Sequence, residues 1–251
     1  MSAVSGLSLR RGPIRLVLSR GLWRSVWYLL GYLAVGWVLF GIAVAVAVGG
    51  AGLSVTLAGL PVLVAAAATI RWCADVERAR LRPMVGGPVA GSYRQVAGSG
   101  VMARLRTRWR DPAIWRDIAY LVGMFVPLLA LDTIVLAVWL VFLAGITLPI
   151  WYWAPWHSIH GVRYHGYDLG YHPNGPHGPG GWGLYVDTLP KALAVAGVCL
   201  ILFLLFNYIV VLTARAHAAV ARGLLGAAED PLRQAKDVLV RPGPLSSNLR
   251  A

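Results

Sequence analysis

The sequence predicts an all-α integral membrane protein with four transmembrane helices, arranged as two parallel-repeat hairpins with both termini in the cytoplasm. Three observations support this fold class. Hydrophobic residues make up 58% of the 251 residues and charged residues only 13%, which is about half the charged fraction of a soluble domain. Long uncharged runs alternate with arginine-rich segments. One sequence pattern also occurs twice, at the start of the first and of the third run.

Four apolar segments are long enough to cross a bilayer, which takes about 20 helical residues. Residues 25–70 carry no charge and have room for two helices, and we expect the chain to turn at the glycine-rich residues 49–52. The third segment is interrupted by Pro127 and Asp132. The predicted spans are residues 26–48, 53–72, 118–149 and 190–214.

The distribution of arginine predicts the orientation, because basic residues collect on the cytoplasmic side of a membrane. Arginines are frequent in the first 25 residues, in the loop 73–117 and after residue 214, whereas the loop 150–189 has only Arg163. We therefore expect the loop 150–189 to lie outside. The predicted domains are a basic N-terminal segment (1–25), a four-span membrane domain (26–226) and a disordered cytoplasmic tail (227–251).

The formal net charge of +13 predicts a basic surface on the inner leaflet. Basic segments next to a membrane bind anionic lipid headgroups, so membrane lipids are the first expected partners. No nucleic acid is expected, since no nucleic-acid-reading motif accompanies the charge. The cysteines, Cys73 and Cys199, cannot form a disulfide framework and fit apolar helix positions.

An internal repeat relates the two halves of the chain. The pattern W-R-x-(V/I)-x-Y-L-x-G covers Trp23–Gly31 and Trp115–Gly123, at the start of the first and third spans. A second pattern, R-x-x-A-x-x-x-R-x-x-L, starts at Arg71 and at Arg215, after the second and fourth spans. Each half is therefore predicted to be a hairpin that enters and leaves on the same side, as in a parallel repeat.

Three motifs resemble a known family. Asp111–Leu121 (DPAIWRDIAYL), Leu148–Trp153 (LPIWYW) and Val186–Leu193 (VDTLPKAL) are similar to the start, exit and return segments of the putative sensor domain of actinobacterial membrane proteins. The resemblance covers about residues 15–226 and implies a multi-pass protein of the cell membrane that acts in signal transduction. In that family the domain often precedes a histidine kinase core. Because only residues 227–251 follow, we expect a stand-alone member.

Five of the six histidines lie in the predicted outer loop, in contrast to the usual family pattern: His157, His160, His165, His172 and His177. Imidazole binds Zn and Cu(II) and titrates near neutral pH. Three interpretations remain open: a Zn or Cu(II) site, a pH sensor, or a solvated loop. A metal would use His157 and His160, which share a face if they lie on a helical turn. Some of His165, His172 and His177 would complete the site, with Asp168 as a candidate oxygen ligand. Without metal, this Gly- and Pro-rich loop should be loosely ordered.

Asp132 is the second departure from the family pattern. A carboxylate inside a span costs several kcal/mol unless it is paired or hydrated, so this aspartate is either functional or held by a structural hydrogen bond. Asn207 in the fourth span is a candidate partner, although its estimated depth matches poorly. His217 is expected at the cytoplasmic interface, just beyond the fourth span.

No enzyme motif is present, so no catalytic residue is expected, and no cofactor apart from the metal that the outer loop could bind. Residues 102–110 (MARLRTRWR) read as a short basic helix on the inner leaflet. The sequence favours a sensor that perceives an extracytoplasmic or membrane signal and passes it to a separate kinase or regulator. The alternative is an accessory or permease-like transporter subunit, with Asp132 in a polar path. A homo-oligomer is compatible with either.

Overall fold

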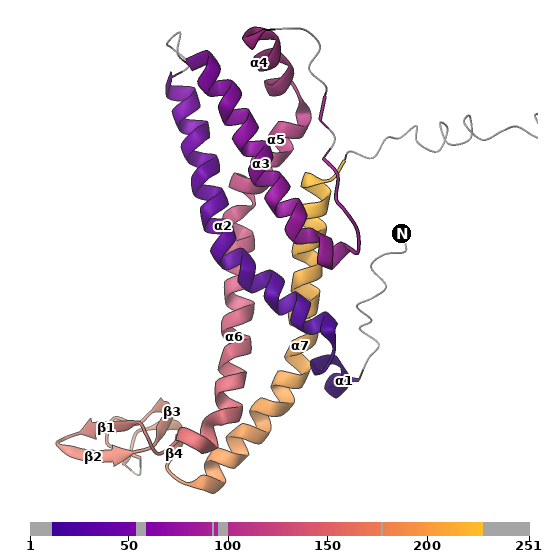
Figure 1. Cartoon of the computed structure of the whole chain (residues 1–251). Helices are drawn as coiled ribbons and strands as arrows, with labels where there is room; N and C mark the ends of the chain where they lie inside the picture. The colour runs from indigo at the N-terminus through magenta and orange to yellow at the C-terminus, as the bar shows by residue number, and fades with distance from the viewer. Residues whose placement is uncertain (1–11, 54–58, 92, 95–99, 177, 228–251) are drawn as a thin grey trace, which may run out of the picture.

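The computed structural model describes residues 12–53, 59–91, 93–94, 100–176 and 178–227, and this part of the chain is mostly helical (Figure 1). The helices are α1 (Pro13–Val17), α2 (Arg20–Leu53), α3 (Gly59–Val85), α4 (Val101–Trp109), α5 (Pro112–Ile118), the π-helix η2 (Ala119–Gly123), α6 (Phe125–Trp151) and α7 (Leu189–Leu225). Between α6 and α7 lie four strands, β1 (Trp156–Ile159), β2 (Val162–His165), β3 (Tyr167–Tyr171) and β4 (Trp182–Val186).

Among the described residues three helices are long and apolar enough to cross a membrane: α2, α6 and α7. They correspond to the first, third and fourth predicted spans. The second predicted span falls partly on residues 54–58, outside the described ranges, and otherwise on α3, which continues into the charged segment up to Val85. Three apolar spans are therefore supported, and the fourth stays a prediction.

The glycine-rich residues 49–52 do not end the first helix, in contrast to the turn expected there, because α2 continues to Leu53. Gly50 is buried, and a Cβ at this position would lie 3.2 Å from Cδ2 of Leu63 on α3. The missing side chain lets the two helices approach closely, which is the common role of glycine between membrane helices. The glycine here serves helix packing rather than a turn.

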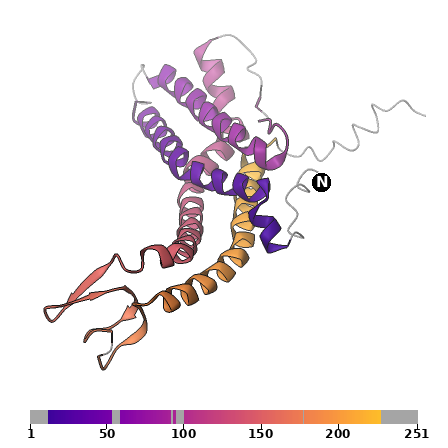
Figure 2. The same cartoon turned by 60° about the horizontal axis from the view of Figure 1, so that its bottom comes forward.

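The two hairpins point in opposite directions (Figures 1 and 2). Near the start of α2, Trp23 meets Trp139 in the second half of α6, with ring centroids 6.4 Å apart. Farther along α2, Phe40 stacks on Phe125 at the start of α6, at 4.1 Å. The two helices therefore run antiparallel where they cross, and the predicted parallel arrangement is wrong for this structure. The repeat encodes the local structure of each half, whereas the packing of the halves depends on long-range contacts.

The repeat itself has a structural counterpart at the start of each hairpin. The indole Nε1 of Trp23 donates a hydrogen bond to the carbonyl of Val17, and that of Trp115 donates to the carbonyl of Trp109, both at 3.1 Å and both six residues back. Each tryptophan thus ties the preceding short helix to the helix that follows it. The shared W-R motif therefore specifies the same local fold twice.

The segment between α6 and α7 contains strands, which its composition did not suggest. Strands β1 and β2 form one antiparallel pair, and β3 and β4 form another. Both pairs lie at the tip of the α6–α7 hairpin (Figure 1). Val186 at the end of β4 is fully buried against Leu148 and Ala192, with Trp151 and Tyr152 packed around them. Backbone pairing and this small apolar cluster hold the segment together.

Candidate functional site

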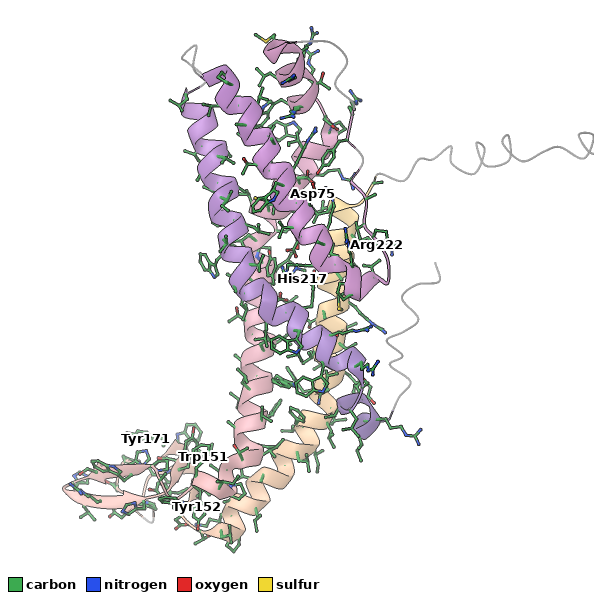
Figure 3. The ribbon with its side chains drawn as sticks, viewed as in Figure 1. Asp75, Trp151, Tyr152, Tyr171, His217 and Arg222 are labelled. Carbon is green, nitrogen blue, oxygen red and sulfur yellow. The ribbon has the colours of Figure 1, made fainter. Side chains whose placement is uncertain are left out.

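The buried centre of the molecule, where the four long helices cross, contains polar side chains. Asp132 on α6 and His217 on α7 are both 0% exposed, and Nδ1 of His217 lies 2.8 Å from Oδ2 of Asp132. His217 therefore does not lie at an interface with water, which corrects the expectation from its position beyond the predicted fourth span. In the structure α7 continues to Leu225 and carries this histidine inside the helix crossing (Figure 3).

Asn207 is not the partner of Asp132. Its Oδ1 accepts a hydrogen bond from Nε1 of Trp139 at 3.0 Å, and its Nδ2 donates to the carbonyl of Phe203 at 2.7 Å. Because α6 and α7 are antiparallel, a residue about two turns after Asp132 on α6 meets a residue about three turns before His217 on α7. Asp132 and Asn207 therefore lie at different depths along the helices, as the sequence suggested, and Asn207 has a structural role.

The polar contacts continue from His217 toward α3. Nε2 of His217 lies 3.2 Å from the hydroxyl of Tyr120, which donates to Oε1 of Glu77 at 3.0 Å. Nη1 of Arg80 donates to Oε2 of Glu77 at 2.6 Å, and the same guanidinium donates through Nη2 to the carbonyl of Tyr28. We call Asp132, His217, Tyr120, Glu77 and Arg80 the polar chain. Its members come from α6, α7, η2 and α3.

With an ionised Glu77 as the acceptor, counting hydrogens gives the protonation of the Asp132–His217 pair. A tyrosine hydroxyl has a single hydrogen, and that of Tyr120 is donated to Glu77. His217 must therefore supply the hydrogen between its Nε2 and Tyr120. The hydrogen at Nδ1 is then an additional proton, carried either by the imidazole or by Asp132. In both forms the pair is neutral overall and shares one proton.

Aromatic rings from α2 enclose the imidazole. The rings of Tyr28 and Tyr32 meet His217 edge to face, with centroid distances of 5.1 and 4.4 Å. Within the described residues, the hydroxyl of Tyr28 and Oδ1 of Asp132 are buried without a hydrogen-bond partner. Polar atoms that are buried and unpaired are unusual, and here two such atoms lie beside the imidazole without the hydrogen bonds that they could form.

The repeat explains why the site is asymmetric. Tyr28 and Tyr120 occupy equivalent positions in the W-R-x-(V/I)-x-Y pattern, and both lie in the polar chain or against it. Tyr120 bonds to Glu77, but the position in the second half that corresponds to Glu77 is Ala221. Tyr28, the repeat equivalent of Tyr120, therefore has no carboxylate to accept a hydrogen bond from its hydroxyl. The halves share a scaffold, and the polar chain occupies only one of the two equivalent positions.

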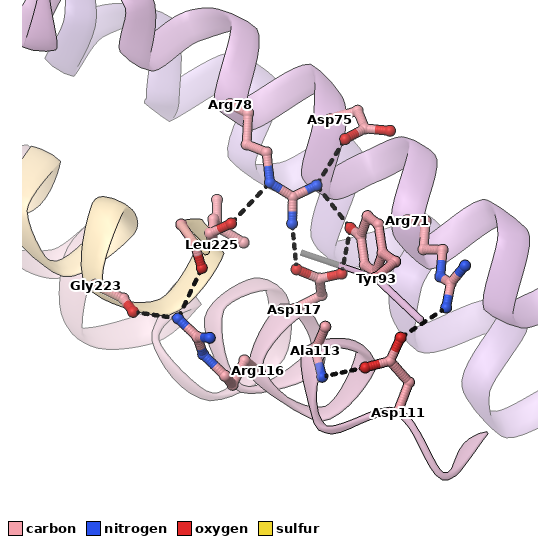
Figure 4. Close-up of polar contacts among 11 residues, drawn as sticks. Arg71, Asp75, Arg78, Tyr93, Asp111, Ala113, Arg116, Asp117, Gly223 and Leu225 are labelled. Atoms are coloured by element: carbon pink, nitrogen blue, oxygen red, sulfur yellow. Dashed lines mark hydrogen bonds and ion pairs between the residues drawn. The ribbon is translucent and has the colours of Figure 1, made fainter. Parts of the chain in front are cut away.

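A second polar cluster holds the end of α7 (Figure 4). Arg78 on α3 donates through Nε to the carbonyl of Leu225 at 2.8 Å and through Nη2 to Asp117 on α5 at 2.7 Å. Arg116 on α5 donates to the carbonyls of Gly223 and Gly226, at 2.7 and 2.9 Å. These carbonyls have no partner inside their own helix. The two arginines therefore cap α7 and tie it to α3 and α5.

The family motif D-P-x-x-W-R-D encodes this cap. Asp111 is the N-cap of α5, where its Oδ1 accepts from the amide of Ala113 at 3.0 Å, and Pro112 follows in the first turn. Asp117 also accepts from the hydroxyl of Tyr93 at 2.7 Å. Burial raises the pKa of Asp117 to about 6, although the hydrogen bond from Tyr93 and the charge of Arg78 favour its ionised form.

The structure places the described histidines between α6 and α7 on different strands and turns. His157 lies on β1, His160 has a positive φ of 50° between β1 and β2, and His165 ends β2. His157 and His160 therefore do not share a helical face. His172 follows β3, and its Nδ1 lies 2.7 Å from Oδ1 of Asp168. His177 lies outside the described residues.

Strands β1 to β4 together form the β region, in which Tyr185 on β4 contacts two of the histidines. Its ring meets those of His157 and His172 at centroid distances of 6.4 and 5.9 Å. Within the described residues no group of three or more His, Cys, Asp or Glu side chains is arranged to hold a metal ion. The metal hypothesis and the pH-sensing interpretation both stay predictions, and one of the candidate ligands, His177, lies outside the described residues.

Sequence reasoning identifies Asp132 but not most of its surroundings. Glu77 reads in the sequence as one of the charges of a cytoplasmic loop, and Tyr28 and Tyr120 stand out only as members of the repeat. The one available signal is that the repeat carries a tyrosine at a fixed position in both halves. A membrane-facing anchor tyrosine would be exposed, whereas these two are buried.

Comparison with known proteins gives one match. Residues 28–225 match the family model described as "Putative sensor". No curated protein matches the chain, and neither does any solved structure. The matched region begins at Tyr28 and ends at Leu225, so it contains all of the polar chain and the residues that cap α7.

Proposed function

The chain belongs to the family described as Putative sensor, and we propose that it is a multi-pass sensor of the cell membrane. In this proposal the outer β region or the membrane-embedded part of the α6–α7 hairpin perceives a signal. The end of α7 then passes the change to a separate protein in the cytoplasm, such as a kinase or another regulator. The low arginine content of residues 150–189 supports an external β region.

The observation that best supports this proposal is the continuity of α7. This helix of 37 residues begins at Leu189, three residues after β4, and ends at Leu225 inside the arginine cap. At its start, Nζ of Lys191 donates to the carbonyl of Tyr185 at 3.3 Å and to Asp187 at 2.7 Å. An unbroken helix transmits a rotation or a shift along its length as a rigid element. A displacement of the β region would thus reach the cap.

We infer that the polar chain holds α7 in one arrangement until such a movement breaks its hydrogen bonds. His217 is on the moving helix, whereas Tyr120 and Glu77 belong to other elements. A shift of α7 by a fraction of a turn would break at least one of these bonds, and a broken bond leaves a buried polar group unpaired. Packed elements of this kind have discrete arrangements rather than a continuum. The residue that links the moving helix to its surroundings is His217.

Photo-crosslinking tests the proposed output. A photoreactive amino acid replaces Arg222, which is exposed in the last turn of α7, or Leu202, an exposed apolar control on the same helix. We expect the probe at residue 222 to capture a specific protein in native membranes, and His217→Gln to change its yield several-fold. Equal capture from residue 202, or no effect of His217→Gln in a folded variant, would contradict the proposal.

The alternative, a transporter subunit, is favoured by one feature, the unbroken series of titratable groups from Asp132 to Glu77. Chains of Asp, Glu and His inside membranes often mark proton pathways. A pH-sensitive dye inside proteoliposomes separates the two functions. Proton flux that stops in Asp132→Asn would support the transporter, whereas the sensor requires none.

A further inference from the structure

A cavity of about 690 Å³ separates the far end of α2 and the start of α3 from α4 and α5. Pockets of 300–1,000 Å³ are typical of sites for small molecules. This cavity is distinct from the polar chain and from the outer β region. Among the residues that line it are Ala47, Leu63, Leu105 and Ile118, which are all apolar.

Two tryptophans give the cavity its chemical character. Trp109 and Trp115 both line it, with ring centroids 5.9 Å apart and an interplanar angle of 65°. Nε1 of Trp109 donates to the carbonyl of Leu63, and Nε1 of Trp115 donates to the carbonyl of Trp109. Since both indole donors are engaged, the rings can offer the cavity only apolar carbon surface. This wall suits a hydrocarbon chain better than a polar ligand.

Two arginines lie at the same cavity. Arg106 and Arg110 line it and are exposed, and neither side chain has a hydrogen bond or an ion pair within the described residues. Arg108 between them differs, because its Nη1 donates to the carbonyl of Val64. Helix α4 has no acidic residue. The free guanidinium groups are therefore available to an external anion, and guanidinium binds phosphate through paired hydrogen bonds.

We propose that this cavity binds an anionic phospholipid, with an acyl chain against Trp109 and Trp115 and the headgroup phosphate on Arg106 and Arg110. An apolar cavity with two unpaired cations at one side complements an amphiphile that has one negatively charged end. A free phosphate would leave the apolar wall empty, and a lipid without net charge, whose own cation neutralises its phosphate, would leave the charge of the two arginines uncompensated. The lipid site does not depend on the proposed sensor function.

Helix α5 connects the site to the end of α7. Trp115 and Ile118 face the cavity, whereas Arg116 and Asp117 on the same seven-residue helix hold the cap through Gly223 and Arg78. A lipid that displaces Trp115 would move a helix whose neighbouring residues cap α7. The cavity is therefore placed to report the lipid composition of the membrane to the same cap.

Native mass spectrometry of the full-length protein tests the site directly. The protein is incubated with phosphatidylglycerol or phosphatidylcholine of equal chain length, or with inorganic phosphate. We expect retention of phosphatidylglycerol to exceed that of phosphatidylcholine by about 10-fold or more, because its net negative charge is attracted by two basic side chains. Arg106→Gln with Arg110→Gln should abolish this preference, and Ala47→Phe should reduce retention by filling the apolar part.

The matched control is Arg15→Gln with Arg20→Gln, which removes the same charge from exposed positions outside the cavity. The control should retain the lipid like the wild type, and Arg106→Lys with Arg110→Lys should keep part of the preference. Circular dichroism checks that each variant is folded. Equal retention of the two lipids, an equal loss in the control pair, or full competition by inorganic phosphate would overturn the proposal.

Discussion

Asp132 on α6 and His217 on α7 are 85 positions apart in the sequence, yet their side chains meet at 2.8 Å in the interior of the molecule. Both are fully buried, so neither side chain can form hydrogen bonds with water. In the sequence the aspartate stands out inside an apolar span, whereas the histidine falls beyond the predicted end of another span and is expected at the interface. The structure joins them as one hydrogen-bonded pair between α6 and α7, and α7 is the helix that links the β region to the cap.

The pair should be strongly coupled in stability. Removing one partner leaves the other buried and unpaired, which typically costs about 3–5 kcal/mol. We therefore expect Asp132→Leu and His217→Leu each to lower the free energy of unfolding by about 3 kcal/mol, measured by denaturant titration in detergent. The double variant should be more stable than the sum of the single losses predicts. Thr133→Leu, an exposed change on the same helix, is the control.

Additive losses in this cycle would show that the two side chains do not depend on each other. The sequence alone allows Asp132→Leu to be neutral or stabilising, which is the expected result for a tolerated, unpaired carboxylate. The structure predicts the opposite, since Asp132 has His217 as its partner and the imidazole would lose it.

The buried carboxyl of Asp117 should give stability a defined dependence on pH. Its pKa is about 6 in the folded protein, above the ordinary value of 3.8, so the folded state binds a proton more readily than the unfolded chain. The contribution of this group is therefore fully present below about pH 4 and is lost as the pH rises through about 6.

We accordingly expect the wild type to gain stability relative to Asp117→Asn as the pH falls from about 7 to about 5. Thermal unfolding of both proteins at each pH measures this difference. Comparing the two proteins removes the effect of every other titrating group, including the carboxyl of Asp111 in the same cluster. A difference that is constant with pH, or that changes in the opposite direction, would show that the pKa is not raised.

The contact between Gly145 on α6 and Cys199 on α7 should tolerate no added side chain. A Cβ at Gly145 would collide with the sulfur of Cys199, and overpacking of this kind typically costs about 1–3 kcal/mol. We expect Gly145→Val to lower the melting temperature, and Cys199→Ala to restore part of the loss. Ala144→Val on the exposed side of α6 should have little effect. Equal effects of the two valines would rule out the close approach.

The opposite directions of the hairpins can be tested by labelling single cysteines with a membrane-impermeant maleimide in a protein whose two native cysteines are replaced. Val162 on β2 marks the tip of the α6–α7 hairpin, and Gly52 at the end of α2, which has open space around it, marks the other. We expect the Val162→Cys variant to react on intact cells and the Gly52→Cys variant only after lysis, because the tips lie at opposite ends (Figure 1).

Labelling of both variants on intact cells would support the parallel hairpins of the sequence prediction and contradict the observed packing. Labelling of the Val162→Cys variant only after lysis would overturn the external position of the β region, and the proposed route of the signal with it. If α2 crosses the membrane, reaction of the Gly52→Cys variant only after lysis would place the start of α2 outside, in contrast to the predicted cytoplasmic N-terminus.

The sequence by itself determined the features that depend on nearby residues. Apolar length predicted α2, α6 and α7, because a helix in lipid must satisfy its backbone internally and carry apolar side chains. The repeated W-R motif predicted equivalent starts for the two hairpins, and both tryptophans bond six residues back. The motif around Asp111 was identified from the sequence as the entry to the third span, and in the structure Asp111 is the N-cap of α5 with Pro112 in the first turn, a purely local arrangement.

Only the tertiary structure decided which distant residues meet. Whether α7 presents Asn207 or His217 to Asp132 depends on the vertical register of two helices, and that register is set where they pack, after an intervening β region whose strands the sequence did not predict. The direction of one hairpin relative to the other depends likewise on the hydrogen bonds of Glu77, Arg78 and Arg80 with η2, α7 and α2. Both the register and the direction depend on long-range contacts between polar groups, which need partners in an interior without water. No local pattern in the chain encodes these contacts.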